Sequence, residues 1–100
     1  MSVSDADIAF ATELFDPLGR ITTRKMMGGL CLYAEGQIFA ILDHDGQIFM
    51  RAKNALAADL AGQGARQFGR MGYWSLPDTA LDDSEAACDW ARRSLSEAED

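Results

Sequence analysis

The sequence predicts a single α+β domain built around an antiparallel sheet. Apolar residues recur at helical spacing near both ends of the chain, whereas the middle alternates with the two-residue period of strands. Acidic-Gly pairs separate the strand-like runs, as they do in β-hairpins. The 100 residues, 48% of them hydrophobic, have the size and composition of one globular domain. We therefore expect one domain over residues 1–100.

A first helix is predicted to start behind Ser4 and to end near Leu18 and Gly19. Asp7 follows Ser4 by three residues, a weaker form of the capping box that opens many helices. The apolar residues after it recur at helical spacing: Ile8, Ala11, Leu14, Phe15 and Leu18.

Four strands are expected to follow as an antiparallel meander. Residues 21–27 have a period of two and begin with β-branched side chains, which predicts a half-exposed strand. The next three runs are residues 30–34, 37–42 and 47–51, joined by turns at Glu35-Gly36 and His44-Asp45-Gly46. The run QIFAIL, residues 37–42, is apolar at nearly every position, which predicts a central strand covered on both faces.

A second helix is predicted over Ala55 to Ala61, capped by Asn54 and closed by Gly62. Residues 65–76 are too few and too often interrupted by glycine for more than one or two short strands before Pro77.

A last helix is predicted from the acidic segment that begins at Leu81, because acids favour a first helical turn. Asp89 is expected to face Arg93 four residues on. Its apolar stripe consists of Ala87, Trp90, Ala91 and Leu95.

Charge is distributed unevenly along this chain of net charge −7. Residues 1–19 hold four acids and no bases, residues 20–77 hold seven bases and four acids, and residues 78–100 hold eight acids and two bases. An acidic protein repels phosphate backbones at long range, so nucleic-acid binding is not favoured unless the central cations cluster on one face.

The cations of the basic middle are the candidate residues for nucleic-acid or anionic-ligand binding. Arg24 and Lys25 point to opposite faces of a strand, so at most one of them is expected to join Arg51 or Lys53 on a neighbouring strand. The candidate ligand-binding residues are Arg24, Lys25, Arg51 and Lys53, and Arg66 and Arg70 extend the basic set.

The chain is expected to be cytoplasmic and not associated with a membrane. The N-terminus has no basic stretch ahead of an apolar region, and no apolar run approaches the length that crosses a bilayer. Because so small a domain buries a limited fraction of its surface, pairing with a second copy would help it, and we expect a homodimer.

No enzyme, cofactor or metal site is expected. The single histidine, His44, lies between Asp43 and Asp45, where a hairpin turn explains the pattern better than catalysis does. Cys31 and Cys88 lie far apart and are interpreted as buried small hydrophobes without a disulfide. The alternative for Cys31 is a thiolate activated by the cations before it.

Three aromatic residues, Phe68, Tyr73 and Trp74, have two interpretations. Beside arginines they are candidates for a binding surface, but we favour a structural role in which they bridge a sheet edge to the last helix.

Three segments of the chain resemble the TfoX N-terminal domain family, which is named for a regulator of natural competence. They are the runs RKMMGGLCLYAEGQIFAILDHDGQIFMRAKN, GYWSLP and DWARRSL. The resemblance covers nearly the whole chain, and Met27 stands where a phenylalanine is common. The matching residues are Arg24, Met26, Gly28, Gly29, Tyr33, Ile38-Phe39-Ala40, Asp45-Gly46, Tyr73-Trp74, Pro77 and Trp90-Ala91.

The resemblance implies an α-β-β-β-α-β-β-α layout like that of secretion-chaperone-like proteins, which pair through their sheets and helices. It brings no catalytic residues with it. It implies a non-catalytic regulatory or protein-interaction module, linked to transcriptional or competence regulation, with an unidentified protein partner. Gly28 and Gly29 are expected to be architectural, letting the backbone bend between two strands.

Overall fold

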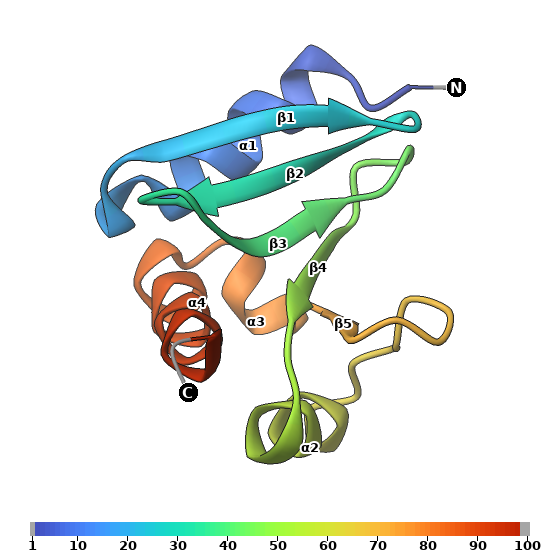
Figure 1. Ribbon diagram of the computed structural model, residues 1–100, viewed down its shortest axis with the longest axis vertical. Coiled ribbons are helices and arrows are strands. Elements are labelled where there is room, and N and C mark those ends of the chain that lie inside the picture. Colours follow the sequence, from blue (N-terminus) through green and yellow to red (C-terminus); the bar gives the residue numbers. More distant parts are fainter. Residues whose placement is uncertain (1, 99–100) are drawn as a thin grey trace.

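The computed structural model describes residues 2–98 and confirms an α+β domain with an antiparallel sheet (Figure 1). The elements in chain order are α1 (Asp5–Phe15), the 3-10 helix η1 (Asp16–Leu18), β1 (Ile21–Met26), β2 (Gly29–Ala34), β3 (Gln37–Leu42), β4 (Ile48–Arg51), α2 (Asn54–Gly62), β5 (Tyr73–Ser75), α3 (Asp78–Leu81) and α4 (Ser84–Ala98).

The five strands lie in the order β1-β2-β3-β4-β5, and every neighbouring pair is antiparallel. Four strands precede α2 and one follows it, instead of the three and two that the resemblance implies. Among the described residues after α2, only Tyr73–Ser75 joins the sheet, while Gln67 makes a single bridge to Trp74. Positive φ angles at Gly64 and Gly69 turn the chain repeatedly there, which leaves no room for a longer strand.

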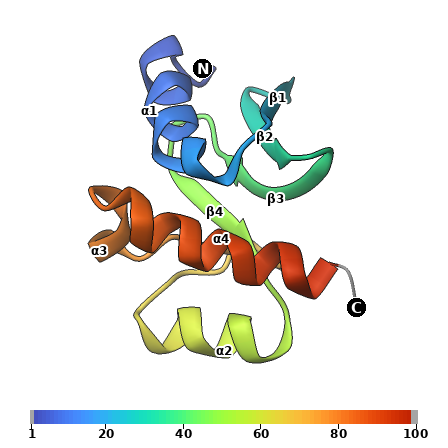
Figure 2. The same ribbon diagram turned by 90° about the vertical axis from the view of Figure 1, so that its left-hand side faces the viewer.

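The long helices lie against one face of the sheet. Figure 2 shows α1 on one side of β1 and β2 and α4 crossing below, and α4 packs against α1, β3 and β4. The core forms where Phe15 of α1 meets Phe39 of β3, with ring centroids 5.0 Å apart. No described helix covers the opposite face of β1, β2 and β3, which faces the viewer in Figure 1.

Two tight hairpins join the first three strands, as the sequence predicts. Met27 and Gly28 both have positive φ (50° and 84°), and so do Glu35 and Gly36 (51° and 83°). Two consecutive positive φ angles define the type I′ turn, whose twist matches that of the flanking strands. Glycine is favoured at these positions because a Cβ makes positive φ costly.

A bulge in β3 determines which of its apolar side chains reach the core. The register changes between Leu32, which pairs with Ala40, and Tyr33, which pairs with Ile38. Phe39 and Ala40 are both fully buried in the core, whereas Ile38 and its neighbour after the bulge, Ile41, are half-buried on the opposite face. The predicted central position of this strand is confirmed, but its second face is not fully covered.

Local capping signals succeed at α1 and fail at α2. The Ser4 hydroxyl accepts the Asp7 N–H at 3.1 Å, as predicted. Asn54 does not cap α2: Lys53 holds the N-cap position without a side-chain bond, and its own N–H donates to the Glu97 carboxylate at 2.9 Å. The α4 helix supplies this acceptor from far along the chain.

The predicted Asp89–Arg93 pair on α4 is also replaced. Asp89 pairs with Arg92 at 2.9 Å, and Arg93 reaches Asp59 of α2 at 2.6 Å. The Arg93 guanidinium also lies over Trp90, 5.4 Å from the ring centroid. Arg93 therefore ties α4 to α2 through its ion pair and contacts Trp90 within its own helix.

Candidate functional site: the open face of the sheet

The sheet face opposite α1 and α4, which we call the open face, carries side chains from all five strands. Cross-strand pairing places Arg24 beside Cys31, Cys31 beside Ile41, and Ile41 beside Phe49. A second row follows along the strands: Tyr33 pairs with Ile38, and Arg51 pairs with Tyr73.

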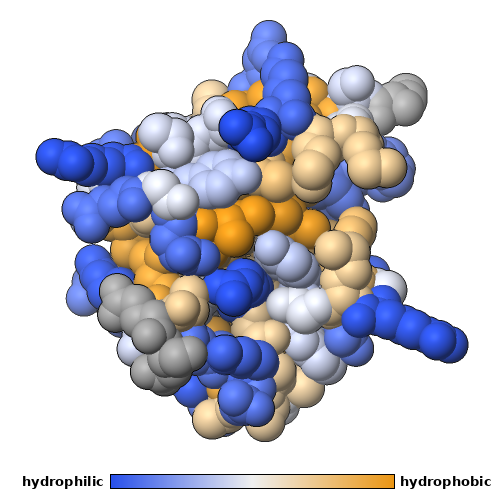
Figure 3. Space-filling view, in the orientation of Figure 1, coloured by the Kyte–Doolittle hydropathy of each residue, from blue (hydrophilic) through white to orange (hydrophobic). Residues whose placement is uncertain are grey.

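A cavity of about 400 Å³ lies on this face, and we call it the sheet groove. Its lining is mainly apolar and includes Met26, Cys31, Ile38, Ile41, Phe68 and Met71. Figure 3 shows the corresponding orange band across the middle of this face, bordered by blue and white side chains. Its volume falls within the range of small-molecule and peptide sites.

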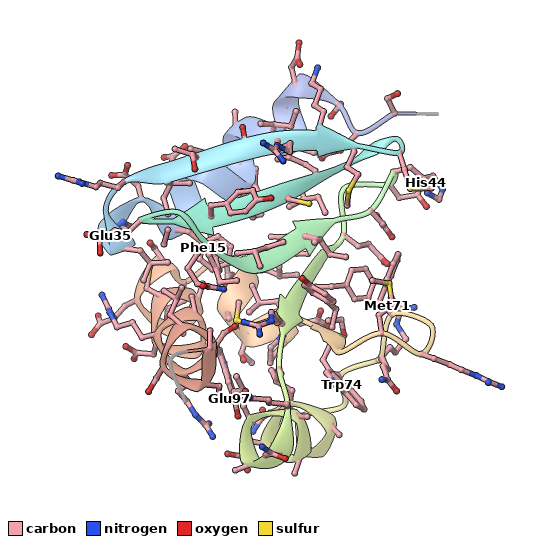
Figure 4. The ribbon with its side chains drawn as sticks, viewed as in Figure 1. Phe15, Glu35, His44, Met71, Trp74 and Glu97 are labelled. Carbon is pink, nitrogen blue, oxygen red and sulfur yellow. The ribbon has the colours of Figure 1, made fainter. Side chains whose placement is uncertain are left out.

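Methionines border the sheet groove on two sides. The loop of residues 66–72 folds over one side, where Phe68 packs on Phe49 with centroids 4.9 Å apart. Met71, on the same loop, is 52% exposed, and Figure 4 shows it below the turn that carries His44. Across the groove, Met26 is 53% exposed at the end of β1. Exposed, flexible methionines are typical of adaptable binding surfaces.

Of the charged groups near the sheet groove, the acid Asp43 makes hydrogen bonds, whereas the two arginines of the open face make none with their side chains among the described residues. The Asp43 carboxylate accepts the N–H groups of Asp45 and Gln47, both at 2.9 Å. Within residues 2–98, neither Arg24 nor Arg51 makes a side-chain hydrogen bond or an ion pair. The open face therefore presents two arginines without an ion-pair partner in the described part of the chain.

Tyr73 connects the groove to one of these cations. Burial raises the pKa of the Tyr73 phenol above its usual value, and the Arg51 charge opposes that shift. Cys31 and Tyr33 add smaller effects of the same sign as burial. Cross-strand pairing places Tyr73 beside Arg51, and Tyr73 lines the groove together with Cys31.

A comparison with protein families decides the identity of the domain. The family model of the TfoX N-terminal domain matches residues 13–98. The chain belongs to this family. The resemblance inferred from the sequence is thereby confirmed, and no curated protein matches the chain. Within residues 2–98, this TfoX N-terminal domain has no helix long and apolar enough to cross a membrane.

The structure does not bring the four predicted ligand-binding residues of the TfoX N-terminal domain together. Arg24 and Lys25 lie on β1, and Lys53 precedes α2 beyond the end of β4. Strands β1 and β4 are separated by β2 and β3, three spacings that amount to roughly 14 Å. Arg24 and Arg51 nevertheless share the open face, while Lys25 alternates to the other face.

The residues of the family pattern divide between turn, core and open face. Gly28 lies in the first turn, and Gly29 is buried against the Leu42 backbone. Tyr33 and Tyr73 lie on the open face. The other two aromatic residues pack elsewhere: Trp74 lies beside α2 in Figure 4, and Trp90 lies under Arg93.

The expected bridge from Phe68, Tyr73 and Trp74 to the last helix is wrong. Phe68 and Tyr73 line the sheet groove, and Trp74 packs toward α2. Sequence reasoning missed the groove as a site. Its signal was the pair Ile38 and Ile41, apolar side chains in excess of what one buried strand face requires.

The cysteines of the domain are buried, as predicted. Cys31 is 3% exposed at the floor of the sheet groove, and Cys88 is 1% exposed behind the sheet, its thiol directed at the Leu14 carbonyl at 3.6 Å. Burial raises the pKa of the Cys88 thiol above its usual value.

His44 lies exposed on its turn beside Asp45. The described part of the chain has no cluster of three potential metal ligands among its histidine, cysteine and acidic residues.

We expect both thiols to react slowly with a disulfide reagent at neutral pH while the protein is folded. Single-cysteine variants, Cys31→Ala and Cys88→Ala, separate the two rates. Because only a deprotonated, accessible thiol attacks, each rate should rise by more than about tenfold when denaturant unfolds the chain. A fast reaction of Cys31 in the native protein would instead support the activated-thiolate alternative.

Proposed function

We propose that this TfoX N-terminal domain is a non-catalytic regulatory module that binds a protein partner through its open face. One observation supports the proposal above all: an apolar groove of about 400 Å³ lies on the side of the sheet that no helix of residues 2–98 covers. Concave, mainly apolar pockets with a few polar groups at their border are the usual form of binding sites. The process it would regulate, by its family's name, is competence or transcription.

The arrangement favours this proposal over nucleic-acid or anionic-ligand binding by the basic segment. Phosphate recognition needs several cations on one surface, but Arg24 lies on β1 and Lys25 alternates to the other face of that strand. Arg51 and Lys53 do line one cavity of about 200 Å³, but the Glu97 carboxylate lines it with them. Homodimerisation remains part of the proposal. Strand β1 is exposed along most of its length and pairs only with β2 in the described chain, so its free edge offers a place for a second copy.

Site-specific photocrosslinking tests the proposed surface. A photoreactive residue at Ile38 should capture a protein partner in lysate of the source cells, and nuclease should not remove it. The same residue at Ala9, exposed on α1 behind the sheet, is the matched control and should capture nothing above background.

Ile41→Glu should reduce capture at position 38 by about tenfold or more, because a carboxylate buried against an apolar partner costs at least 1.4 kcal/mol. Ala9→Glu should leave capture unchanged, and circular dichroism should show both variants folded. Equal capture from positions 38 and 9 would refute the assignment of the open face. Capture that nuclease removes, together with a salt-dependent DNA mobility shift, would favour the nucleic-acid alternative.

A further inference from the structure

We propose that the open face binds an acidic amphipathic helix of the partner, whose apolar stripe fills the sheet groove and whose flanking acids pair with Arg24 and Arg51. The inference rests on the proposed function, since it specifies the chemistry of the segment that the open face receives. It follows from the dimensions of the face, from its charge and from its missing layer.

The dimensions of the open face match one helix. Strands β2 and β3 have six residues each, which corresponds to roughly 20 Å, the length of a helix of about 13 residues. Arg24 and Arg51 extend from strands roughly 14 Å apart, and a helix with its side chains is about 10–12 Å wide. A helix lying between the two arginines therefore reaches both with acids on opposite sides of its apolar stripe.

The architecture leaves one layer incomplete. α1 and α4 cover one face of the sheet, and Ile38 and Ile41 stay half-exposed on the other. An antiparallel sheet commonly leaves one face to solvent, but apolar side chains on that face gain free energy when a further layer covers them. Met26 and Met71 border the groove with unbranched side chains that adjust to the ridges of an incoming helix.

The charges select an acidic helix over a basic one. Two acids that border this region already accept backbone hydrogen bonds. Asp43, which lines the groove, accepts two backbone N–H groups, and Glu97, which lines a smaller cavity with Arg51, accepts the Lys53 N–H. Arg24 and Arg51 have no ion-pair partner within residues 2–98. An incoming carboxylate gains a bidentate partner at either arginine, whereas an incoming lysine meets like charge.

Designed peptides test this inference without knowledge of the partner. One helical peptide of about 16 residues carries leucines at helical spacing, flanked on both sides by glutamates. A twin has lysine at every glutamate position, and a third has the composition of the first in an order that destroys the apolar stripe. Fluorescence anisotropy at physiological salt should show the acidic peptide binding at least tenfold more tightly than the other two.

Charge reversal supplies the decisive comparison. In the double variant Arg24→Glu/Arg51→Glu, the acidic peptide should lose at least tenfold in affinity and the lysine twin should gain. The control Arg20→Glu/Arg92→Glu changes the net charge equally, at the residue before β1 and on α4, which packs against the other face of the sheet, and should keep the wild-type order. Equal binding of the acidic and scrambled peptides, or an unchanged preference in the first variant, would overturn the inference.

Two further outcomes separate this inference from the proposed function. If Ile38 crosslinks a partner but the wild-type domain does not distinguish the peptides by charge, the acidic helix is wrong and the docking surface stands. If the domain alone self-associates in sedimentation experiments and Arg24→Glu/Arg51→Glu abolishes that association, the open face belongs to a second copy and the inference fails.

Discussion

Replacing Phe39 by alanine is expected to lower the free energy of unfolding by about 3–5 kcal/mol. Phe39 is fully buried and meets Phe15 edge to face, with ring planes at 77°. Its removal costs the transfer free energy of a large side chain, leaves a cavity between α1 and β3, and ends an aromatic contact. The free energy of unfolding of a domain of this size is about 5–15 kcal/mol, so this loss is a large part of it. In urea unfolding, the urea concentration at the midpoint should therefore fall sharply.

The neighbouring substitution Ile38→Ala is the matched control. Ile38 precedes Phe39 on the same strand, but the bulge leaves it half-buried in the sheet groove. Its truncation should cost less than about 1.5 kcal/mol, because the site already borders solvent. Equal losses for the two variants would mean that the bulge does not separate a core side of β3 from a groove side.

The features that the sequence predicted well have local causes. The Ser4 cap depends on residues three apart, and the hairpin at Glu35-Gly36 depends on two adjacent residues that accept positive φ. Such signals are complete within a few positions, so the α+β class and the order of the first strands follow from the chain itself. The glycine-rich segment after α2 carried no comparable signal: the residues predicted one or two short strands, the resemblance implied two, and the described chain has one, Tyr73–Ser75.

Long-range partners explain the local predictions that failed. Lys53 and Asn54 begin α2, but the acceptor for the Lys53 N–H is Glu97, 44 residues away. Arg93 has Asp89 within its own helix, yet it pairs with Asp59 because α2 lies beside α4. Helical spacing predicts which side chains can meet along one helix. Which of several possible partners a charged side chain actually pairs with depends on how the helices pack.

The candidate site required the same long-range information. The apolar run QIFAIL indicated a strand with two apolar faces, but it did not show that the described helices leave one of those faces uncovered. The placement of Arg24 and Arg51 on one face depends on strand order and on alternation across four strands. Neither the strand order nor the face on which each arginine lies can be derived from the spacing of Arg24 and Arg51 in the sequence.

Gly29→Ala is expected to destabilise the domain by about 3 kcal/mol, the upper part of the usual cost of overpacking. Gly29 begins β2 in the family's glycine pair, and a Cβ there would collide with the carbonyl oxygen of Leu42 on β3. Because the obstacle is backbone, relief requires the two strands to separate. Those strands form the floor of the sheet groove, so the acidic peptide should also bind more weakly.

Gly62→Ala provides the comparison within the same protein. Gly62 ends α2, has no atom within 4 Å of an added Cβ, and does not require a positive φ. Alanine there reduces the freedom of the unfolded chain and should stabilise the domain by about 0.4–1 kcal/mol. Urea unfolding of both variants decides the point. If Gly29→Ala were as well tolerated as Gly62→Ala, the close approach of β2 and β3 would not be the reason for glycine at position 29. The turn at Gly28 would then be the only structural requirement for glycine in this pair.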